Sequence, residues 1–269
     1  MQFGEGNVLT KVAVSSPQSE YFHITDTKVH NITNLADKSK AIRQHDRLKT
    51  TIRRFGAELI DLKELDRHPN SVFTRDTSVV TPYGYIRLSM GLPSRRGEED
   101  WMENVLKGLQ IPQLGRIELP ATAEGGDIIL AGKTVFIGNS TRTNVFGIEQ
   151  LTEIFRRVRY DVRVTSVPSP FLHIGGAMSV INPVTILHVE HVFPKNFFSG
   201  FKTIKVPNKT FISGNVITLG SNELIANKEN KLTIERLREH NFTVHELNLN
   251  EFVKGTGGPS CLIMPVQRK

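Results

Sequence analysis

Short runs rich in Val, Ile and Leu recur in pairs along the middle of the chain, and each pair flanks a cluster of turn residues. Apolar runs of strand length separated by Gly, Pro, Asn or Ser are typical of β-hairpins. The pattern therefore predicts four hairpins, which cover residues 78–88, 127–137, 177–189 and 215–226.

Helical periodicity lies between these hairpins. Apolar residues spaced three and four apart predict helices over residues 35–55, 98–109, 144–159 and 228–241. The segment between Val189 and Lys209 is short and leaves room for a turn of helix at most. One unit, made of a strand, a tight turn, a second strand and a helical segment, therefore recurs along the chain.

The recurring unit has a fairly regular length. Successive hairpin turns are 48, 51 and 38 residues apart, counted between Gly84, Gly132, Pro183 and Ser221. Residues 1–65 and the closing segment 252–266 bring the total to about five units. Repetition at this period indicates radial or solenoid assembly. No linker or low-complexity run divides the chain, so we expect a single domain over residues 1–269.

Composition narrows the class of protein. The hydrophobic fraction is 38%, which allows a sizeable core, and no apolar run approaches the roughly 18 residues of a membrane span. The N-terminus lacks the pattern of a secretion signal. The single cysteine cannot form an intramolecular disulfide, and no Cys/His cluster has the spacing of a zinc finger. We expect a cytoplasmic protein with no membrane partner.

The net charge of +7 and the isoelectric point of about 9.5 raise the question of nucleic acid. The basic residues are scattered among acids on the predicted helices, and aromatic residues make up 7% of the chain, so no stacking platform is present. We therefore expect no nucleic-acid partner. A basic field does favour the approach of a small anionic group such as an amino-acid carboxylate.

Three reactive side chains occupy the same place in successive units. Asp76, Glu124 and His173 each precede a predicted hairpin, at separations of 48 and 49 residues. Cys261 is expected in the last strand, behind the glycine-rich run 254–259. Equivalent positions of a closed radial array meet near its axis, so we expect these four side chains to converge.

The four residue types fit one reaction. A guanidinium ion is planar and rich in donors, so carboxylates bind it through paired hydrogen bonds. Its carbon is weakly electrophilic, which calls for a thiolate nucleophile. A histidine can protonate the departing amine and later activate water. Asp76, Glu124, His173 and Cys261 form a minimal set for hydrolysing a guanidinium group of arginine or a close derivative.

Each residue also has a purely structural interpretation. A lone cysteine is usually a small buried hydrophobe, and His173 between two aliphatic residues is typical of a core histidine. Asp76 could pair with its neighbour Arg75, and the sequence from Glu124 to Asp127 could be turn chemistry. The shared phase of three of the residues, together with the cysteine behind a glycine-rich run, favours the catalytic interpretation.

At this point the sequence resembles the guanidine-modifying superfamily, which includes arginine deiminases, dimethylarginine dimethylaminohydrolases and amidinotransferases. The matching segments lie between Asn70 and Pro265 in the order of the family. They are Asn70 to Asp76, Pro93 to Arg96, Glu124 to Asp127, Gly138 to Asn144, Leu172-His173, and Gly257 to Cys261 with Met264-Pro265. Each alone is weak, but six in register are specific.

The resemblance implies a pentein fold, an α/β five-bladed propeller of ββαβ-type repeats with pseudo-fivefold symmetry. It implies that Cys261 forms a covalent thiouronium intermediate and that His173 is the acid and base. Asp76 and Glu124 would grip the guanidinium. The remaining implied substrate contacts are Arg142 and Arg95, which would hold the α-carboxylate, and Asn70. No metal or organic cofactor is implied.

The subfamily follows from smaller features. Asn70, the run Thr74-Arg75-Asp76 and the Gly-Gly-Pro-x-Cys-x-x-Met-Pro ending resemble arginine deiminases. Deiminases, however, usually carry a helical insertion and an aspartate two residues after the histidine, where this chain has Gly175. The compact length and the run from Ser140 to Asn144 resemble dimethylargininases. A dimethylargininase-like hydrolase that forms citrulline and an amine is therefore favoured.

Several alternatives remain open from the sequence. An arginine deiminase or a compact arginine dihydrolase would release ammonia instead, and an amidinotransferase would need a second acceptor site. A non-catalytic ribosome-binding factor on the same fold would lack the Asp, Glu, His and Cys set that this chain carries. The expected partner is a small-molecule substrate, arginine or a methylarginine, and a homodimer is compatible with the sequence.

Overall fold

A computed structural model describes residues 4–269, and residues 1–3 of the expected first unit lie outside the described part. The fold is a mixed α/β arrangement that contains five sheets of three strands each. In every sheet an antiparallel pair is joined by a third, parallel strand. The five sheets match the five units predicted from the repeat.

Four sheets follow chain order. They are β3 (Ser78–Thr81), β4 (Gly84–Arg87) and β5 (Gln113–Arg116); β6 (Ile128–Ala131), β7 (Thr134–Asn139) and β8 (Asp161–Ser166); β9 (Met178–Asn182), β10 (Thr185–Val189) and β11 (Lys202–Val206); β12 (Val216–Gly220), β13 (Glu223–Asn227) and β14 (Thr243–Leu247). All four predicted hairpins are present. The parallel third strand needs a crossover connection, which explains the long segment after each hairpin.

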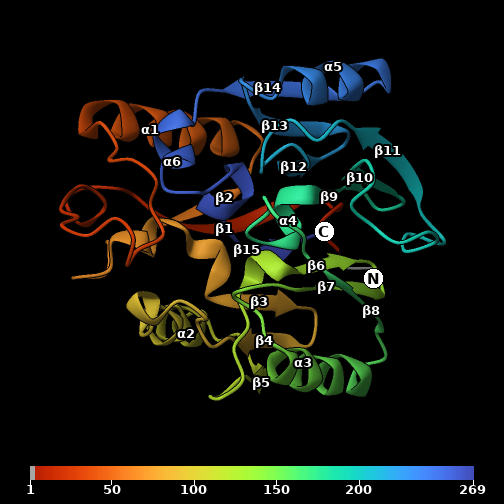
Figure 1. Ribbon diagram of the computed structural model, residues 1–269, viewed down its shortest axis with the longest axis horizontal. Helices are drawn as coiled ribbons and strands as arrows, with labels where there is room; N and C mark the ends of the chain where they lie inside the picture. The colour runs from red at the N-terminus through yellow and green to blue at the C-terminus, as the bar shows by residue number, and fades with distance from the viewer. Residues whose placement is uncertain (1–3) are drawn as a thin grey trace.

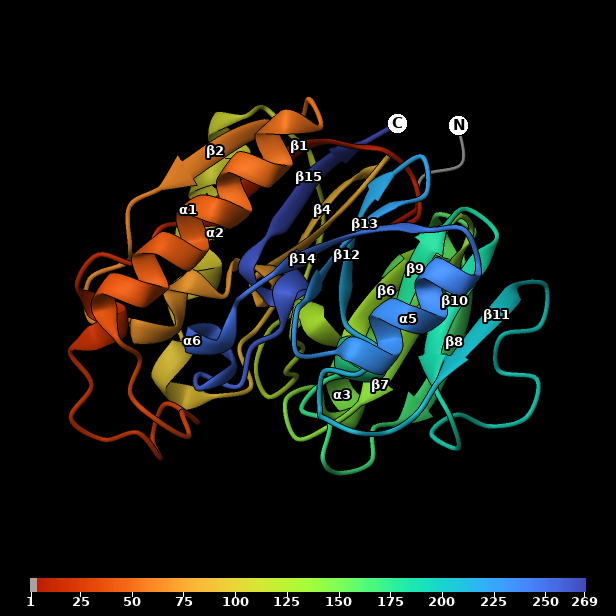
Figure 2. The same cartoon turned by 90° about the horizontal axis from the view of Figure 1, so that it is seen from above.

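The two ends of the chain build the fifth sheet together. β1 (Leu9–Ser15) pairs antiparallel with β15 (Met264–Arg268) and parallel with β2 (Glu58–Leu62). Backbone hydrogen bonds between Val8 and Lys269 continue this pairing, and β1 and β15 run side by side in Figure 2. The expected N-terminal unit and closing segment are therefore parts of one sheet.

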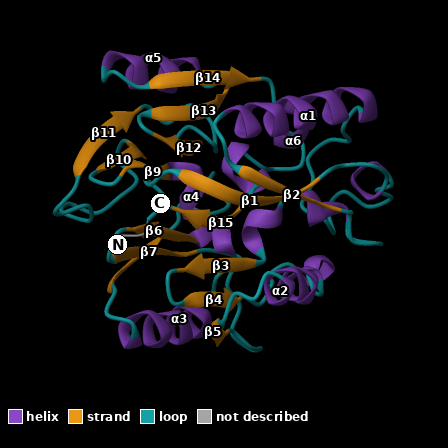
Figure 3. Ribbon diagram, turned by 180° about the vertical axis from the view of Figure 1, so that it is seen from behind, coloured by secondary structure: helices purple, strands orange, loops and turns teal. Residues whose placement is uncertain are grey.

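Helices connect the second and third strands of four sheets. They are α1 (Lys38–Arg54), α2 (Glu98–Gly108), α3 (Val145–Arg157) and α5 (Lys231–Glu239), and they lie around the outside of the molecule in Figures 1 and 3. α1 begins three residues later than predicted because the side chain of Asp37 caps it by accepting the Lys40 amide hydrogen. No described helix is long and apolar enough to cross a membrane.

The apolar faces of these helices form the core. In α3, Leu151, Ile154 and Phe155 pack in one cluster with Val135 and Ile137 of β7. Residues at positions i, i+3 and i+4 share one helix face, so the period that predicted the helix also supplies its buried stripe.

The connection between β10 and β11 contains no helix. Its turns instead carry Phe193, Phe197 and Phe198, which pack with Phe136 of β7 and Ile186 of β10. These bulky side chains cover apolar strand positions that a crossover helix covers elsewhere in the molecule.

Short elements separate the sheets and carry most of the candidate residues. They are η1 (Glu20–Phe22), η2 (Pro69–Val72), η3 (Thr74–Asp76), η4 (Pro93–Arg95), η5 (Gly125–Asp127), α4 (Ile174–Ala177), α6 (Asn250–Val253) and η6 (Pro259–Leu262). Cys261 lies in η6, before β15 rather than in the last strand. The prediction of a strand at Cys261 was wrong because Pro259 begins a tight turn there.

Candidate active site

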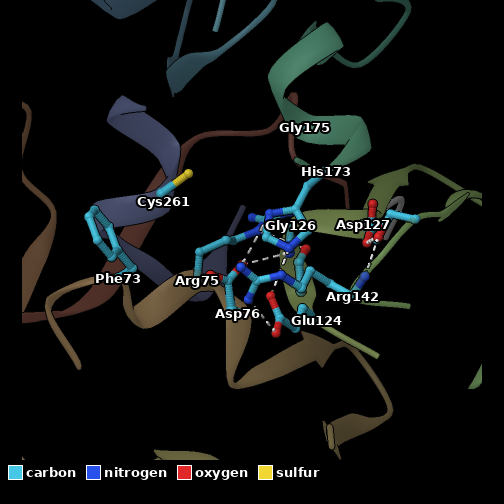
Figure 4. Close-up of polar contacts among 12 residues, drawn as sticks. Phe73, Arg75, Asp76, Glu124, Gly126, Asp127, Arg142, His173, Gly175 and Cys261 are labelled. Atoms are coloured by element: carbon cyan, nitrogen blue, oxygen red, sulfur yellow. Dashed lines mark hydrogen bonds and ion pairs between the residues drawn. The ribbon is translucent and has the colours of Figure 1, made fainter. Parts of the chain in front are cut away.

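Asp76, Glu124 and His173 meet although about fifty residues of chain separate each from the next. Asp76 ends η3 before β3, Glu124 precedes η5 before β6, and His173 precedes α4 before β9. One ligand-type atom from each lies within 4.8 Å of the other two. Figure 4 shows their side chains pointing toward one another, with Cys261 to one side and its sulfur directed toward the side of His173.

Glu124 holds His173. Its Oε2 lies 2.8 Å from His173 Nε2, while Oε1 accepts hydrogen bonds from the Gly91 and Leu92 amides at 3.1 and 3.2 Å. Burial alone would raise the pKa of Glu124, but the hydrogen bond and charge of His173, with the nearby arginines, lower it to about 2. Glu124 is thus an ionised acceptor whose oxygens are already engaged by protein donors.

His173 is surrounded by carboxylates. Burial alone would lower its pKa, but the charges of Asp76 and Asp127 and the hydrogen bond with Glu124 raise it to about 9. The ring also lies against Gly126, where an added Cβ would come within 2.6 Å of His173 Nδ1. A glycine at this position therefore leaves the space that the imidazole ring occupies.

Asp76 faces two donors. Its Oδ2 accepts from Arg95 Nη1 at 2.6 Å, and its Oδ1 accepts from the Gly126 amide at 3.1 Å. Asp76 Oδ1 also lies 3.9 Å from His173 Nδ1. The local pair between Asp76 and Arg75 that the sequence allowed is absent among the described contacts, since Arg75 pairs with Glu5 instead.

Arg95 is a buried and heavily engaged side chain. Its Nε and Nη2 both donate to Glu98 Oε2, at 3.0 and 2.7 Å, and Nη2 also donates to the Phe73 carbonyl. Together with the bond to Asp76, these contacts use most of its five donors. Arg95 therefore acts in this structure mainly to hold Asp76 in place, although it borders the candidate cavity.

Arg142 and Asn70 border the same cavity, which has a free volume of about 20 Å³. Within residues 4–269, the Arg142 guanidinium has one hydrogen-bonding partner, Glu124 Oε1 at 3.4 Å, so most of its donors are unused. Asn70 Nδ2 donates to the His30 carbonyl, and its buried Oδ1 has no described partner. This polar cavity presents both a cation and free hydrogen-bonding groups.

Cys261 is held by neutral groups. Its Sγ accepts from the Gly258 amide at 3.4 Å. Desolvation of the sulfur, with the charge of Asp76, raises the pKa of the thiol to about 12, against the smaller opposing effects of Gly258, Arg75 and Arg95. Without a bound cation, Cys261 is therefore a thiol at neutral pH.

A second cavity adjoins the first and has a different character. One part of its wall is formed by Gly175 and by the apolar side chains Ile129, Leu172, Phe211 and Ile212, while Arg75, Asn215 and Ser260 line the rest. Leu172, His173, Thr256 and Cys261 border both cavities. His173 and Cys261 therefore stand between the compartment of Arg142 and Asn70 and one that has an apolar wall beside Gly175.

Two further residues position the site and were not predicted from the sequence. Asp127 Oδ1 accepts the amide hydrogen of Ile174, directly after His173, at 2.9 Å. Asn215 Oδ1 accepts that of Ser260, directly before Cys261, at 3.0 Å. Asp127 and Asn215 each stand one residue before the first strand of a hairpin, β6 and β12. This shared position before a hairpin is the sequence feature by which both residues could have been predicted.

Asp76, Glu124 and His173 could by geometry hold a metal ion. Arg95 Nη1, however, lies 2.6 Å from Asp76 and 4.0 Å from Glu124, and Arg142 also contacts Glu124. The two arginines already balance the charge of these carboxylates, so the three residues are better described as part of an ion-pair network.

Comparison with known proteins places this site in a family. A family model described as N,N dimethylarginine dimethylhydrolase, eukaryotic, matches residues 17–268. The N(G),N(G)-dimethylarginine dimethylaminohydrolase of Pseudomonas aeruginosa is 27% identical over 226 residues, which cover 84% of this chain and 88% of that protein. The arginine deiminase of Listeria innocua is 28% identical over 256 residues, which cover 76% of this chain and 63% of the deiminase.

A solved structure agrees with these sequence matches. A cysteine-to-serine mutant of the P. aeruginosa enzyme in complex with citrulline has a TM-score of 0.85 and 25% identity. The superposition covers 96% of this chain and 99% of that one. The mixed α/β fold is therefore the fold of those enzymes.

Proposed function

Because the chain belongs to the dimethylarginine dimethylaminohydrolase family of hydrolases that act on arginine derivatives, we propose that it hydrolyses the guanidinium group of N-methylated arginine. The products would be citrulline and a methylated amine. Residues 1–269 would act as one catalytic domain, with the five sheets closed into a propeller around the site. The free thiol that this chemistry needs fits the reducing, cytoplasmic setting expected from the single cysteine.

The first half of the reaction joins the substrate to Cys261. The guanidinium would enter beside Asp76, the carboxylate whose charge raises the pKa of the thiol. A bound cation offsets that charge, which lowers the pKa of Cys261 and releases the thiol proton to water. The thiolate then attacks the guanidinium carbon, and His173, charged because its pKa is about 9, protonates the departing amine. A covalent thiouronium remains.

The second half regenerates the enzyme. His173, now neutral, takes a proton from a water molecule as that water attacks the thiouronium carbon. The carbon–sulfur bond breaks and Cys261 leaves as thiolate. The new hydroxyl group gives its proton to this thiolate as the urea carbonyl forms, which restores the thiol and releases citrulline. Glu124 stays ionised throughout and keeps His173 oriented, a role that its engaged oxygens support better than direct contact with the guanidinium.

The observation that supports a methylated substrate is the apolar wall of the cavity on the Gly175 side of Cys261 and His173. An unsubstituted guanidinium would bury N–H donors against Ile129, Phe211 and Ile212, at a cost of roughly 1–3 kcal/mol for each donor left unpaired. Methyl groups replace those donors and fill apolar space. The polar cavity on the other side, with Arg142, would hold the α-carboxylate.

Arginine deiminase activity is the second candidate. Asn70 supports it, because this buried amide borders the polar cavity and its Oδ1 has no partner among the described residues, so it can accept a hydrogen bond from substrate. A dihydrolase would continue from the same intermediate to ornithine. The three activities share the first covalent step, so their products and substrate preferences separate them.

One substrate panel tests the proposal. We expect kcat/KM for monomethylarginine and asymmetric dimethylarginine to equal or exceed that for arginine, with citrulline and methylated amines as products. Agmatine, which lacks the carboxylate, should be poor, and Arg142→Ala should weaken arginine-type substrates while affecting agmatine little. Efficient turnover of arginine with no turnover of methylarginines would replace the proposal with the deiminase, or with the dihydrolase if ornithine appears.

Gly175→Asp sharpens the same test. Gly175 does not have a positive φ, so the backbone accepts a side chain, but an added Cβ would lie 3.0 Å from the Gly126 carbonyl oxygen. A carboxylate here would restore an acceptor for N–H donors, so preference should shift toward arginine. The thermal midpoint of the variant separates altered specificity from misfolding, and an unchanged preference in a well-folded variant would argue against this role of the apolar cavity.

A further inference from the structure

A small cavity shares Arg75 with the second cavity beside Cys261 but none of the other residues that line it. It has a free volume of about 20 Å³, which is room for one body of the size of a water molecule. Its polar lining residues are Glu5, Arg75, Ser78 and Arg268, and the rest of the wall is aliphatic or Met and Pro. We call this space the basic cavity.

The charges around the basic cavity do not balance. Arg75 and Arg268 are both buried, and Glu5 forms an ion pair with Arg75. Arg268 Nη1 donates to the Asn7 and Thr218 carbonyls at 2.7 and 2.8 Å, and no carboxylate of residues 4–269 lies within ion-pair distance of it. The charge of Glu5 also acts on Arg268, so one carboxylate is shared by two guanidinium groups and one positive charge is in excess, which is costly in a protein interior.

Two residues that line the same space have hydrogen-bond donors without a partner. Arg268 Nε and Ser78 Oγ are buried and have no partner within the described part of the chain. Burial also lowers the pKa of Arg268 to about 10, which leaves it charged at neutral pH. An N–H and an O–H without acceptors, next to an unbalanced guanidinium, form an environment suited to an anion.

We propose that the basic cavity binds a single monovalent anion of the size of chloride. Arg268 Nε and Ser78 Oγ donate hydrogen bonds to it, and the charge that Arg268 carries without a partner supplies the attraction. An open groove of about 640 Å³ shares Val80 and Arg268 with the cavity and also carries Lys269, so an ion can approach the site from this face. A water molecule would satisfy the donors but not the charge.

Bromide identifies the occupant directly. Crystals of the intact protein grown in sodium bromide should show an anomalous peak between Arg268 and Ser78. In solution, sodium chloride should raise the thermal midpoint about 3 °C more than sodium gluconate at equal ionic strength, because gluconate is too large for the cavity. A cavity that holds water without an anomalous peak, or equal effects of the two salts, would overturn the proposal.

Variants assign the effect to the cavity. Arg268→Met should abolish the chloride-specific rise, and the milder Ser78→Ala, which is expected to fold in any case, should weaken it. Arg236→Met is the matched control, because Arg236 is half exposed on α5 and pairs with Glu239 at the surface. A chloride-specific rise that persists unchanged in Ser78→Ala and in a folded Arg268→Met would place the anion elsewhere. None of these measurements depends on catalysis, so they test the anion site independently of the proposed function.

Discussion

The two halves of the candidate site are held in opposite ways. His173 is held by charge, since Glu124 bonds its ring and Asp127 accepts the next backbone amide hydrogen. Cys261 is held by neutral groups, since Gly258 donates to its sulfur and Asn215 accepts the preceding amide hydrogen. The two pKa values differ accordingly: the surrounding carboxylates stabilise the charged form of His173, whereas the surroundings of Cys261 favour the neutral thiol.

In the proposed mechanism, this difference means that Cys261 is activated only when the substrate binds. A protein that stabilised both ions permanently would keep a reactive thiolate exposed to oxidation. In the proposed mechanism, His173 is already protonated before substrate binds, whereas Cys261 loses its proton only when a cation is bound. Substitutions that change His173 or Cys261 separately test this difference.

Removing the nucleophile should have the largest effect. Cys261→Ser keeps nearly the same volume but replaces the thiol with a hydroxyl that is far less ionised, so turnover should fall by on the order of 10⁴-fold or more. Folding should change little, as judged by the thermal midpoint. Mass spectrometry of the parent with a slow substrate should find the adduct on Cys261. Substantial turnover by the serine variant would exclude the covalent mechanism.

Removing the acid and base should have the next largest effect. His173→Ala should slow both formation and breakdown of the thiouronium, by about 10² to 10⁴ in rate. Rapid-quench kinetics separates the two steps, and the intermediate should accumulate if breakdown is the slower. Glu124→Gln offers the sharper control, because the ring remains while its charged partner is lost. A pH–rate profile unchanged in His173→Ala would show that another group moves the protons.

Alkylation of Cys261 tests the neutral half without substrate. The thiol pKa is raised to about 12, so each pH unit below that value changes the thiolate fraction tenfold. Labelling by iodoacetamide should therefore rise about 100-fold between pH 7 and pH 9, and the single cysteine makes the label unambiguous. Over the same range the His173 ring should stay charged until about pH 9 in an NMR titration. Fast labelling at pH 7 would mean that the thiolate is stabilised in advance.

The two positioning residues should produce the smallest and most instructive effects. Asp127→Asn removes a negative charge near His173 and should lower its pKa, which moves the alkaline limb of the pH–rate profile to lower pH. Asn215→Ala removes the support of Ser260 and should reduce kcat by about tenfold without moving that limb. A shift of the limb in Asn215→Ala, or none in Asp127→Asn, would contradict the division into a charged and a neutral half.

The sequence alone predicted what depends on local periodicity. The hairpins and the helices of residues 98–109 and 144–159 follow from apolar spacing of two, three and four residues, which neighbouring residues determine. The common phase of Asp76, Glu124 and His173 predicted their convergence, because equivalent positions of a repeat take equivalent places in space. The six matching segments indicated the family.

The hydrogen bonds and ion pairs between distant side chains are visible only in the folded structure. Glu124 orients His173, Arg95 holds Asp76, and Arg75 pairs with Glu5, and each of these partnerships joins different elements of the fold. Such contacts depend on the register and spacing of whole sheets, which no local pattern encodes. The same holds for Arg268, which is an ordinary basic residue near the end of the sequence. It becomes a buried, unbalanced charge once β15 pairs with β1 and closes over the basic cavity.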